Sequence, residues 1–175
     1  MPLEENKALA RRAIDEIWSK GNLAVGPDIY SPNFLSHQHS HPDIGDVRGL
    51  SALIEFVREF REAFPDFQDT IDDQVAEGDK VVTRFTSTGT HRGTLMGLQP
   101  TNKRACWMGI VIDRIEEGKI VEEWVSWDLS GMMQQLGGIP QRAEACLRFT
   151  NSKTLQPPAS AQEYRTVGQR EQIRY

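Results

Sequence analysis

Asp128 is the side chain in this sequence whose position best suits chemistry. It ends the stretch EEGKIVEEWVSWD, residues 116–128, where a predicted strand gives way to a predicted helix. If that strand buries one face in an apolar pocket, burial raises the pKa of Asp128 and suits it to acid–base catalysis near neutral pH. Side chains alternate along a strand, so that face would carry Ile120, Glu122, Trp124, Ser126 and Asp128. The structural alternative is that Asp128 caps the helix that begins at Leu129, because Asp is a favoured N-cap.

His91 is a second candidate for proton transfer, in the stretch GTHRG at the end of another predicted strand. An unperturbed imidazole exchanges protons near neutral pH. His91 could therefore hydrogen-bond a substrate carbonyl, or pair with Asp128 and orient it. The alternative is that it fixes the turn before Gly93.

Three of the four histidines are grouped at His37, His39 and His41, with Asp43 close behind. On a strand the three imidazoles would share one face, but sites of this kind usually need a carboxylate or a further histidine. We therefore expect no metal site. His37 is expected to face the pocket, and the rest of the group to lie in a solvated loop.

Aromatic and hydroxyl side chains are the other candidates for contact with a substrate. Most aromatic residues are expected in the core, and a subset to line the pocket of a small domain. The predicted substrate-contacting residues, besides His37, are Trp18, Phe60, Phe64, Trp107, Trp124 and Ser126. No G-x-S-x-G, Walker or dinucleotide-binding motif occurs, so we expect no cofactor.

The elements that must position these residues follow from hydrophobic spacing. Apolar residues at three- and four-residue steps predict helices over residues 3–20 and 50–64. Alternation predicts two pairs of strands after the second helix, turning at Gly78-Asp79 and at Glu117-Gly118. Residues 23–34 indicate a short helix or turns, and residues 129–136 a short last helix. Helices followed by antiparallel strands predict an α+β domain with helices on one face of a curved sheet.

Composition narrows the classes of function. The 175 residues suit one domain, and the net charge of −5 without a basic patch argues against nucleic acid as a partner. No apolar run is long enough to span a membrane, and no signal region is visible, so a cytoplasmic protein is expected. Cys106 and Cys146 form no C-x-x-C pair, and Cys106 is expected to be packed.

The order and spacing of three stretches resemble the SnoaL-like polyketide cyclases, or ester cyclases, of the nuclear transport factor 2-like superfamily. The stretches are YSPNFLSH, then AFPDFQDTIDDQVAEGDKVVTRFTSTGTHRGTLMGLQPTNKR, then IDRIEEGKIVEEWVSWDLSGMMQQLG. The resemblance covers about residues 5–137. It implies a domain over residues 1–137, built as a curved antiparallel sheet wrapped around N-terminal helices and open to an apolar pocket. Residues 138–175 would be an extension, either a tail or an arm laid on a partner.

The resemblance also implies a function. Such cyclases use no metal or organic cofactor, commonly form dimers or higher oligomers, and close a polyketide ring by an intramolecular aldol step. An aspartate near position 128 acts as their acid–base group, and histidines are usual at the positions of His91 and His37. An isomerase or hydratase acting on a similar enolisable substrate is an alternative, since one fold hosts several chemistries. A non-catalytic domain that binds a small hydrophobic molecule is the other, and Asp128 would then be a cap.

Overall fold

The computed structural model describes residues 2–38 and 45–139. The chain divides into two units, Met1–Gln141 and Arg142–Tyr175, and only the first is described. The predicted extension over residues 138–175 therefore lies outside the described residues, apart from its first two. His39 and His41 lie outside them as well.

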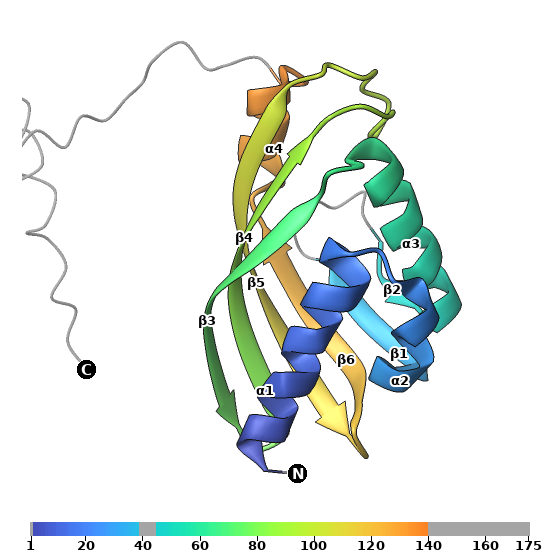
Figure 1. The fold of residues 1–175 in the computed structure, drawn as a ribbon, viewed down its shortest axis with the longest axis vertical. Helices are drawn as coiled ribbons and strands as arrows, with labels where there is room; N and C mark the ends of the chain where they lie inside the picture. Colours follow the sequence, from blue (N-terminus) through green and yellow to red (C-terminus); the bar gives the residue numbers. More distant parts are fainter. Residues whose placement is uncertain (1, 39–44, 140–175) are drawn as a thin grey trace, which may run out of the picture. The chain divides into compact units, whose positions relative to one another are not determined.

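A six-stranded sheet forms one layer of the first unit (Figure 1). Its order is β2-β1-β6-β5-β4-β3, with only β1 and β6 parallel. The strands are β1 (Tyr30–Gln38), β2 (Val47–Arg48), β3 (Gln68–Glu77), β4 (Lys80–Thr90), β5 (Arg104–Glu116) and β6 (Lys119–Trp127). The turns at Gly78-Asp79 and Glu117-Gly118 are confirmed. Glu117 and Gly118 both have positive φ angles, 50° and 75°, as a tight turn between twisted strands requires.

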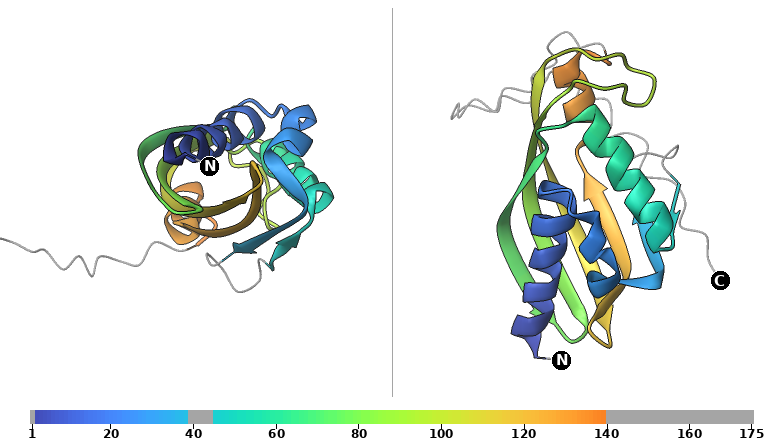
Figure 2. Two further views of the ribbon diagram at one scale, coloured as in Figure 1. Left: turned by 90° about the horizontal axis from the view of Figure 1, so that it is seen from below. Right: turned by 45° about the vertical axis from the view of Figure 1, so that its right-hand side comes forward.

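The helices pack on the concave side of this sheet. Figure 2 shows the strands curving around α1 (Leu3–Arg12), which continues as a π-helical stretch over Ala13–Ser19. A 3-10 turn (Leu23–Val25) and α2 (Gly26–Ile29) lead into β1, while α3 (Leu50–Ala63) and α4 (Leu129–Leu136) complete the set. The α+β fold, with N-terminal helices against a curved sheet, is therefore confirmed.

The strands β1 and β2 are the elements that the sequence did not predict. Pro32 and an irregular register between Tyr30 and Leu35 interrupt the alternation of β1, so residues 23–34 indicated a short helix or turns, of which the helical part is present over residues 23–29. The strand forms because Tyr30 and Phe34 bury their rings in the core, where the two centroids lie 4.8 Å apart. Its parallel pairing with β6 joins residues about 90 positions apart, which local pattern cannot reveal.

The direction in which β6 faces also differs from the expectation. Ile120 is buried, but the next inward side chain is Glu123, three residues on. A register shift between Arg114 and Ile115, opposite this point, marks a β-bulge that changes the phase of the alternation. From there on Glu123, Val125 and Trp127 face inward, and the set that includes Trp124 and Ser126 faces outward. The expected face is therefore wrong beyond Ile120.

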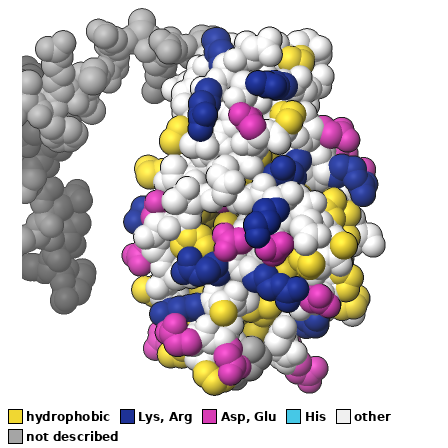
Figure 3. Space-filling model, viewed as in Figure 1, with side chains coloured by type: hydrophobic (Ala, Val, Ile, Leu, Met, Phe, Trp, Pro, Cys, Tyr) yellow, Lys and Arg dark blue, Asp and Glu magenta, His cyan; other side chains and the backbone are white. Residues whose placement is uncertain are grey.

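The surface is mixed in charge. Figure 3 shows basic and acidic side chains interspersed over the face that carries α1, without a basic patch. Arg84 on β4 forms an ion pair with Asp72 on the neighbouring strand β3, at 3.0 Å. Cys106 is exposed rather than packed, which corrects that expectation. Among the described helices none is long and apolar enough to cross a membrane.

Candidate active site

A cavity lies between the helices and the concave face of the sheet. The space open to the centres of water-sized molecules is about 70 Å³, within about 660 Å³ of empty space that includes open solvent at the mouth. Aromatic side chains dominate its wall, among them Trp18, Phe56, Phe60, Phe85, Trp107 and Trp127. The strands place inward side chains along its length, and α1 and α3 close the other side. The composition of this lining is that of a binding site for an apolar molecule.

Gly109 on β5 makes room for part of this wall. A Cβ atom at this position would lie 2.4 Å from the Phe85 ring and 2.9 Å from Cβ of Trp127. Both neighbours line the cavity and flank Gly109 in the sheet register. The glycine therefore allows two large aromatic side chains to occupy one inward layer.

Two carboxyl groups meet at one part of the cavity. Asp113 and Glu123 are directly opposite each other on β5 and β6, each only 3% exposed. The Ser36 hydroxyl donates a hydrogen bond to Oε1 of Glu123 at 2.7 Å, and Gln38 donates to Ser36 at 2.7 Å. Asp113 also lines the cavity, beside Glu123 on the neighbouring strand.

Burial raises the pKa of both groups. The pKa of Glu123 rises to about 7 because of desolvation, although the Ser36 hydrogen bond opposes the rise. The pKa of Asp113 rises well above its ordinary value, first through burial and then through the charge of Glu123. Burial also raises the pKa of Tyr30 beside them, with the same two carboxylates adding to the effect. A pair in this state can hold one proton and release it near neutral pH.

Asp69 brings a third carboxyl group to the cavity, from β3. It is 7% exposed and accepts a hydrogen bond from the Ser87 hydroxyl at 2.5 Å. Burial raises the pKa of Asp69 to about 7, against the lowering effect of Ser87. Each of the three buried acids therefore titrates well above the usual range of a carboxyl group.

The cavity and fold can now be set beside known proteins. The family model of the SnoaL-like polyketide cyclases matches residues 8–136. The chain belongs to the SnoaL-like polyketide cyclase family. Among proteins with curated functions, none has a sequence that matches this chain.

Solved structures of similar proteins agree with this assignment. AclR of Streptomyces galilaeus, a proposed hydroxylase, is 29% identical with a TM-score of 0.69, over 79% of this chain and 89% of that one. A proposed SnoaL-like polyketide cyclase of Jannaschia sp. CCS1 is 25% identical with a TM-score of 0.72, over 80% and 97%. IdmH of Streptomyces antibioticus, a proposed polyketide cyclase, is 26% identical with a TM-score of 0.66, over 75% and 98%.

In this SnoaL-like protein Asp128 is a helix cap. It is exposed, and its Oδ1 accepts a hydrogen bond from the Gly131 amide at 2.7 Å at the start of α4. It is not among the residues that line the cavity. This geometry matches the structural alternative given by the sequence, and the acid–base role of Asp128 stays a prediction.

His91 is buried behind the cavity wall. Its Nδ1 accepts a hydrogen bond from the Thr101 amide at 3.2 Å, while its backbone amide bonds the Lys103 carbonyl. Its ring packs against Phe64, with centroids 5.5 Å apart, and burial lowers its pKa. These contacts hold the connection between β4 and β5, so the turn-fixing alternative describes its placement, and its catalytic role stays a prediction.

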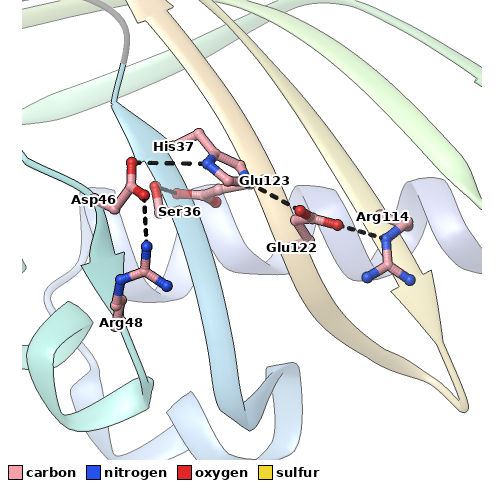
Figure 4. A network of polar contacts seen from close by, with 7 residues as sticks. All are labelled: Ser36, His37, Asp46, Arg48, Arg114, Glu122 and Glu123. Atoms are coloured by element: carbon pink, nitrogen blue, oxygen red, sulfur yellow. Dashed lines mark hydrogen bonds and ion pairs between the residues drawn. The ribbon is translucent and has the colours of Figure 1, made fainter.

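His37 points to the convex face of the SnoaL-like sheet (Figure 4). Its Nε2 lies 2.9 Å from Glu122, and its ring stacks on Trp124 with centroids 5.5 Å apart. Glu122 also accepts a hydrogen bond from Arg114 at 2.9 Å. His37, Trp124 and Ser126 therefore lie away from the cavity, and the geometry gives their predicted substrate contacts no support.

Of the aromatic residues predicted to contact a substrate, some line the cavity and others do not. Trp18, Phe60 and Trp107 line the cavity as expected, whereas Phe64 is fully buried behind it. The acids Asp69, Asp113 and Glu123 were missed. Asp113 carried a sequence feature that could have revealed it, because it occupies the inward phase of the alternation Trp107, Gly109, Val111, Asp113, Ile115, where an acid is unexpected.

Proposed function

We propose that this SnoaL-like protein is a cofactor-independent acid–base enzyme acting on an enolisable, polyketide-like or aromatic ketone. The observation that supports this is the pair formed by Asp113 and Glu123, buried opposite each other at an aromatic cavity. The family contributes the expectation of an enzyme, since similar solved structures are named as proposed cyclases.

The pair can supply an acid and a base at one place. Two carboxylates in an apolar site repel each other, and among the described lining residues none is cationic. One of the two groups therefore keeps a proton while the other is ionised. Ser36 donates to Glu123, which favours ionised Glu123 and protonated Asp113.

The proposed reaction is an intramolecular aldol closure. The ionised carboxylate removes a proton from a carbon next to a carbonyl group, and the aromatic wall excludes water and folds the substrate. The resulting carbanion attacks a second carbonyl carbon of the same molecule and forms the new carbon–carbon bond. The protonated carboxyl group then gives its proton to the new alkoxide, and the pair has exchanged its protonation states.

Two alternatives use the same cavity. An isomerase or hydratase would need the same carboxylate and carboxylic acid, but would return the proton to another carbon or add water. The position of Asp128 as a cap favours a non-catalytic binding domain, as reasoned from the sequence. The buried pair favours an enzyme, because uncompensated carboxyl groups in an apolar cavity are costly to a domain that only binds.

Hydrogen–deuterium exchange tests the proposal without knowledge of the product. Polycyclic ketones with acidic α-hydrogens are incubated with the protein in D₂O and followed by NMR. We expect catalysed exchange, lost in Glu123→Gln and retained in Asp128→Asn, with thermal melting as the folding control. Exchange that needs Asp128 but not Glu123 would return the acid–base role to the position given by the resemblance. No exchange with bound ketone would indicate a binding domain.

We also propose that the protein is a homo-oligomer, at least a dimer, through the convex face of the sheet. This face exposes apolar side chains on β5 and β3, with Met108 62%, Ile110 45% and Val75 59% exposed. Exposed apolar groups on a sheet favour burial against a partner. Sedimentation of the unmodified protein should show a dimer, and Ile110→Lys should dissociate it. A monomeric unmodified protein would exclude the proposed oligomer. A cytoplasmic location stays a prediction.

A further inference from the structure

The cavity is unusual in the sign of its charge. It carries three carboxyl groups, Asp69, Asp113 and Glu123, and among the described residues that line it none is Lys, Arg or His. Eight aromatic side chains form much of the remaining wall. Carboxylates and the faces of aromatic rings both attract cations. The lining therefore favours a positively charged group over a neutral or negative one.

Asp69 is the acid that the proposed chemistry leaves unused. Only its Oδ1 is occupied, by the Ser87 hydroxyl, and its other carboxyl oxygen accepts no hydrogen bond from a described residue. Phe67, two residues earlier on the same face, lies 6.0 Å from Trp107 and 6.3 Å from Trp18 between ring centroids. A largely buried carboxyl group that lines the cavity beside a cluster of aromatic rings is a suitable site for an ammonium group.

Arg61 is the one cation whose contacts reach this end of the cavity among the described residues. Its guanidinium donates to the carbonyl oxygens of Trp18 at 2.7 Å and Ser19 at 2.8 Å. It forms no ion pair with Asp69 and does not line the cavity. Because the Arg61 guanidinium bonds to backbone carbonyl groups, it does not neutralise Asp69. A positively charged ligand group inside the cavity could do so.

Asp69 is also remote from the proposed catalytic pair. Asp69 is paired with Ser87, and Ser87 with Trp107, whereas Asp113 stands six residues further along β5. At about 3.3 Å per residue, that separates the two ends by roughly 20 Å along a flat strand, and by less in a curved sheet. One cavity thus offers an anchoring acid at one end and an acid–base pair at the other.

We propose that the substrate is an elongated ring compound that carries a protonated amine, and that Asp69 binds this amine. The proposal rests on the proposed function in taking this cavity as the substrate site, with Asp113 and Glu123 left for the reacting carbonyl group. Asp69 is then a specificity-determining residue: it selects for the amine and holds the ketone end against the pair.

Three matched fluorescent probes test the ligand class with the unmodified full chain. They share an anthracene ring and differ at position 9: an aminomethyl group (cationic), a hydroxymethyl group (neutral) and a carboxylate (anionic). Binding is measured by fluorescence titration at pH 7.5. We expect the amine to bind about tenfold more tightly than the alcohol, and the carboxylate to bind most weakly. Equal binding of the amine and the alcohol would overturn the proposal.

A variant series assigns the preference to Asp69. Asp69→Asn should reduce amine binding to the level of the alcohol and leave alcohol binding unchanged. Asp72→Asn, at an exposed acid on the same strand, is the matched control and should retain the preference. If Asp69→Asn does not fold, Ser87→Ala, which removes only the hydroxyl partner, should still prefer the amine. Loss of binding to all three probes in a folded Asp69→Asn protein would contradict an amine-specific role.

Failure of this inference and failure of the proposed function give different results. Glu123→Gln should abolish hydrogen–deuterium exchange while the preference for the amine probe persists. If the protein catalyses exchange of ketone protons but binds the amine and the alcohol equally, the proposed function stands and the amine-bearing substrate is excluded. If the protein prefers the amine but catalyses no exchange, the amine site stands and the proposed function is excluded.

Discussion

Glu122 and Glu123 are adjacent on β6 and have opposite environments. Glu122 points to the convex face, where hydrogen bonds from His37 and then Arg114 lower its pKa. Glu123 points into the cavity, where burial raises its pKa to about 7 (Figure 4). A glutamate is therefore an ion-pair partner on the convex face of the sheet and a candidate proton carrier on the concave face.

The difference shows how the fold separates two uses of charge. On the convex face, Glu122 meets His37 and Arg114, which favour its ionised form. On the concave face, the acids are surrounded by aromatic rings or lie beside another acid, so their protonated form is favoured. Because side chains alternate, one step along the strand changes the environment completely.

The largest expected effect is on turnover. Glu123→Gln removes a titrating member of the pair and should lower catalysed exchange by about 10²- to 10⁴-fold, as for loss of a general acid–base group. Glu122→Gln, the matched change one residue away, should leave exchange within about threefold, measured by NMR with the same ketones. Equal losses in both variants would remove the distinction between the two faces.

The free energy of unfolding should depend on pH because burial raises the pKa of acids such as Asp69. Well below pH 4, Asp69 is protonated in both the folded and the unfolded state. As the pH rises to about 7, the unfolded state ionises while the folded state keeps its proton, so the free energy of unfolding falls. The shift corresponds to an upper bound of roughly 4 kcal/mol.

Asp69→Asn does not titrate, so it should be more stable than the unmodified protein at pH 8, by about 2 kcal/mol, with little difference at pH 4. Urea unfolding at both pH values measures this. Asp66→Asn is the opposite control, since hydrogen bonds from Thr90 lower the pKa of Asp66 and stabilise its ionised form. Its destabilisation should grow as the pH rises through the acidic range. A stability gain in Asp66→Asn at pH 8 would contradict this reasoning.

A smaller effect is expected at Asp128. Asp128→Ala removes the N-cap of α4 and should destabilise the protein by about 1 kcal/mol, whereas Asp128→Asn should cost little, because Asn caps almost as well. Thermal melting measures both. A normal melting temperature in Asp128→Asn with lost or pH-shifted turnover would instead support the acid–base role that the resemblance implies.

The smallest effect is expected on the convex face. His37→Ala removes the imidazole from Glu122 and should change the free energy of unfolding by under about 1 kcal/mol, since partly exposed pairs of this kind contribute little. Part of any loss should come from the stacked Trp124 ring and so persist in high salt. A loss of ligand binding in the cavity would show that His37 reaches the substrate after all.

The sequence predicted the parts of the fold that depend on local pattern. Apolar spacing marked the helices now seen at Leu3–Arg12 with its π-helical continuation and at Leu50–Ala63, and alternation marked the four long strands. The strand β1 escaped prediction because Pro32 breaks its pattern and its partner is distant in the chain. The family resemblance implied an apolar pocket, and the expectation that some aromatic residues line it named Trp18, Phe60 and Trp107, but neither named the acids.

The sequence by itself determined the α+β class, the two strand pairs, the helix start at Asp128 and the membership of the family, since each depends on near neighbours or on the order of motifs. Only the tertiary structure decided which acids are buried. A single bulge near Ile120 changes which residues of β6 face inward, and pairing across β5 and β6 places Asp113 against Glu123. The pKa of a carboxyl group depends on what surrounds it, and that environment is assembled from distant parts of the chain.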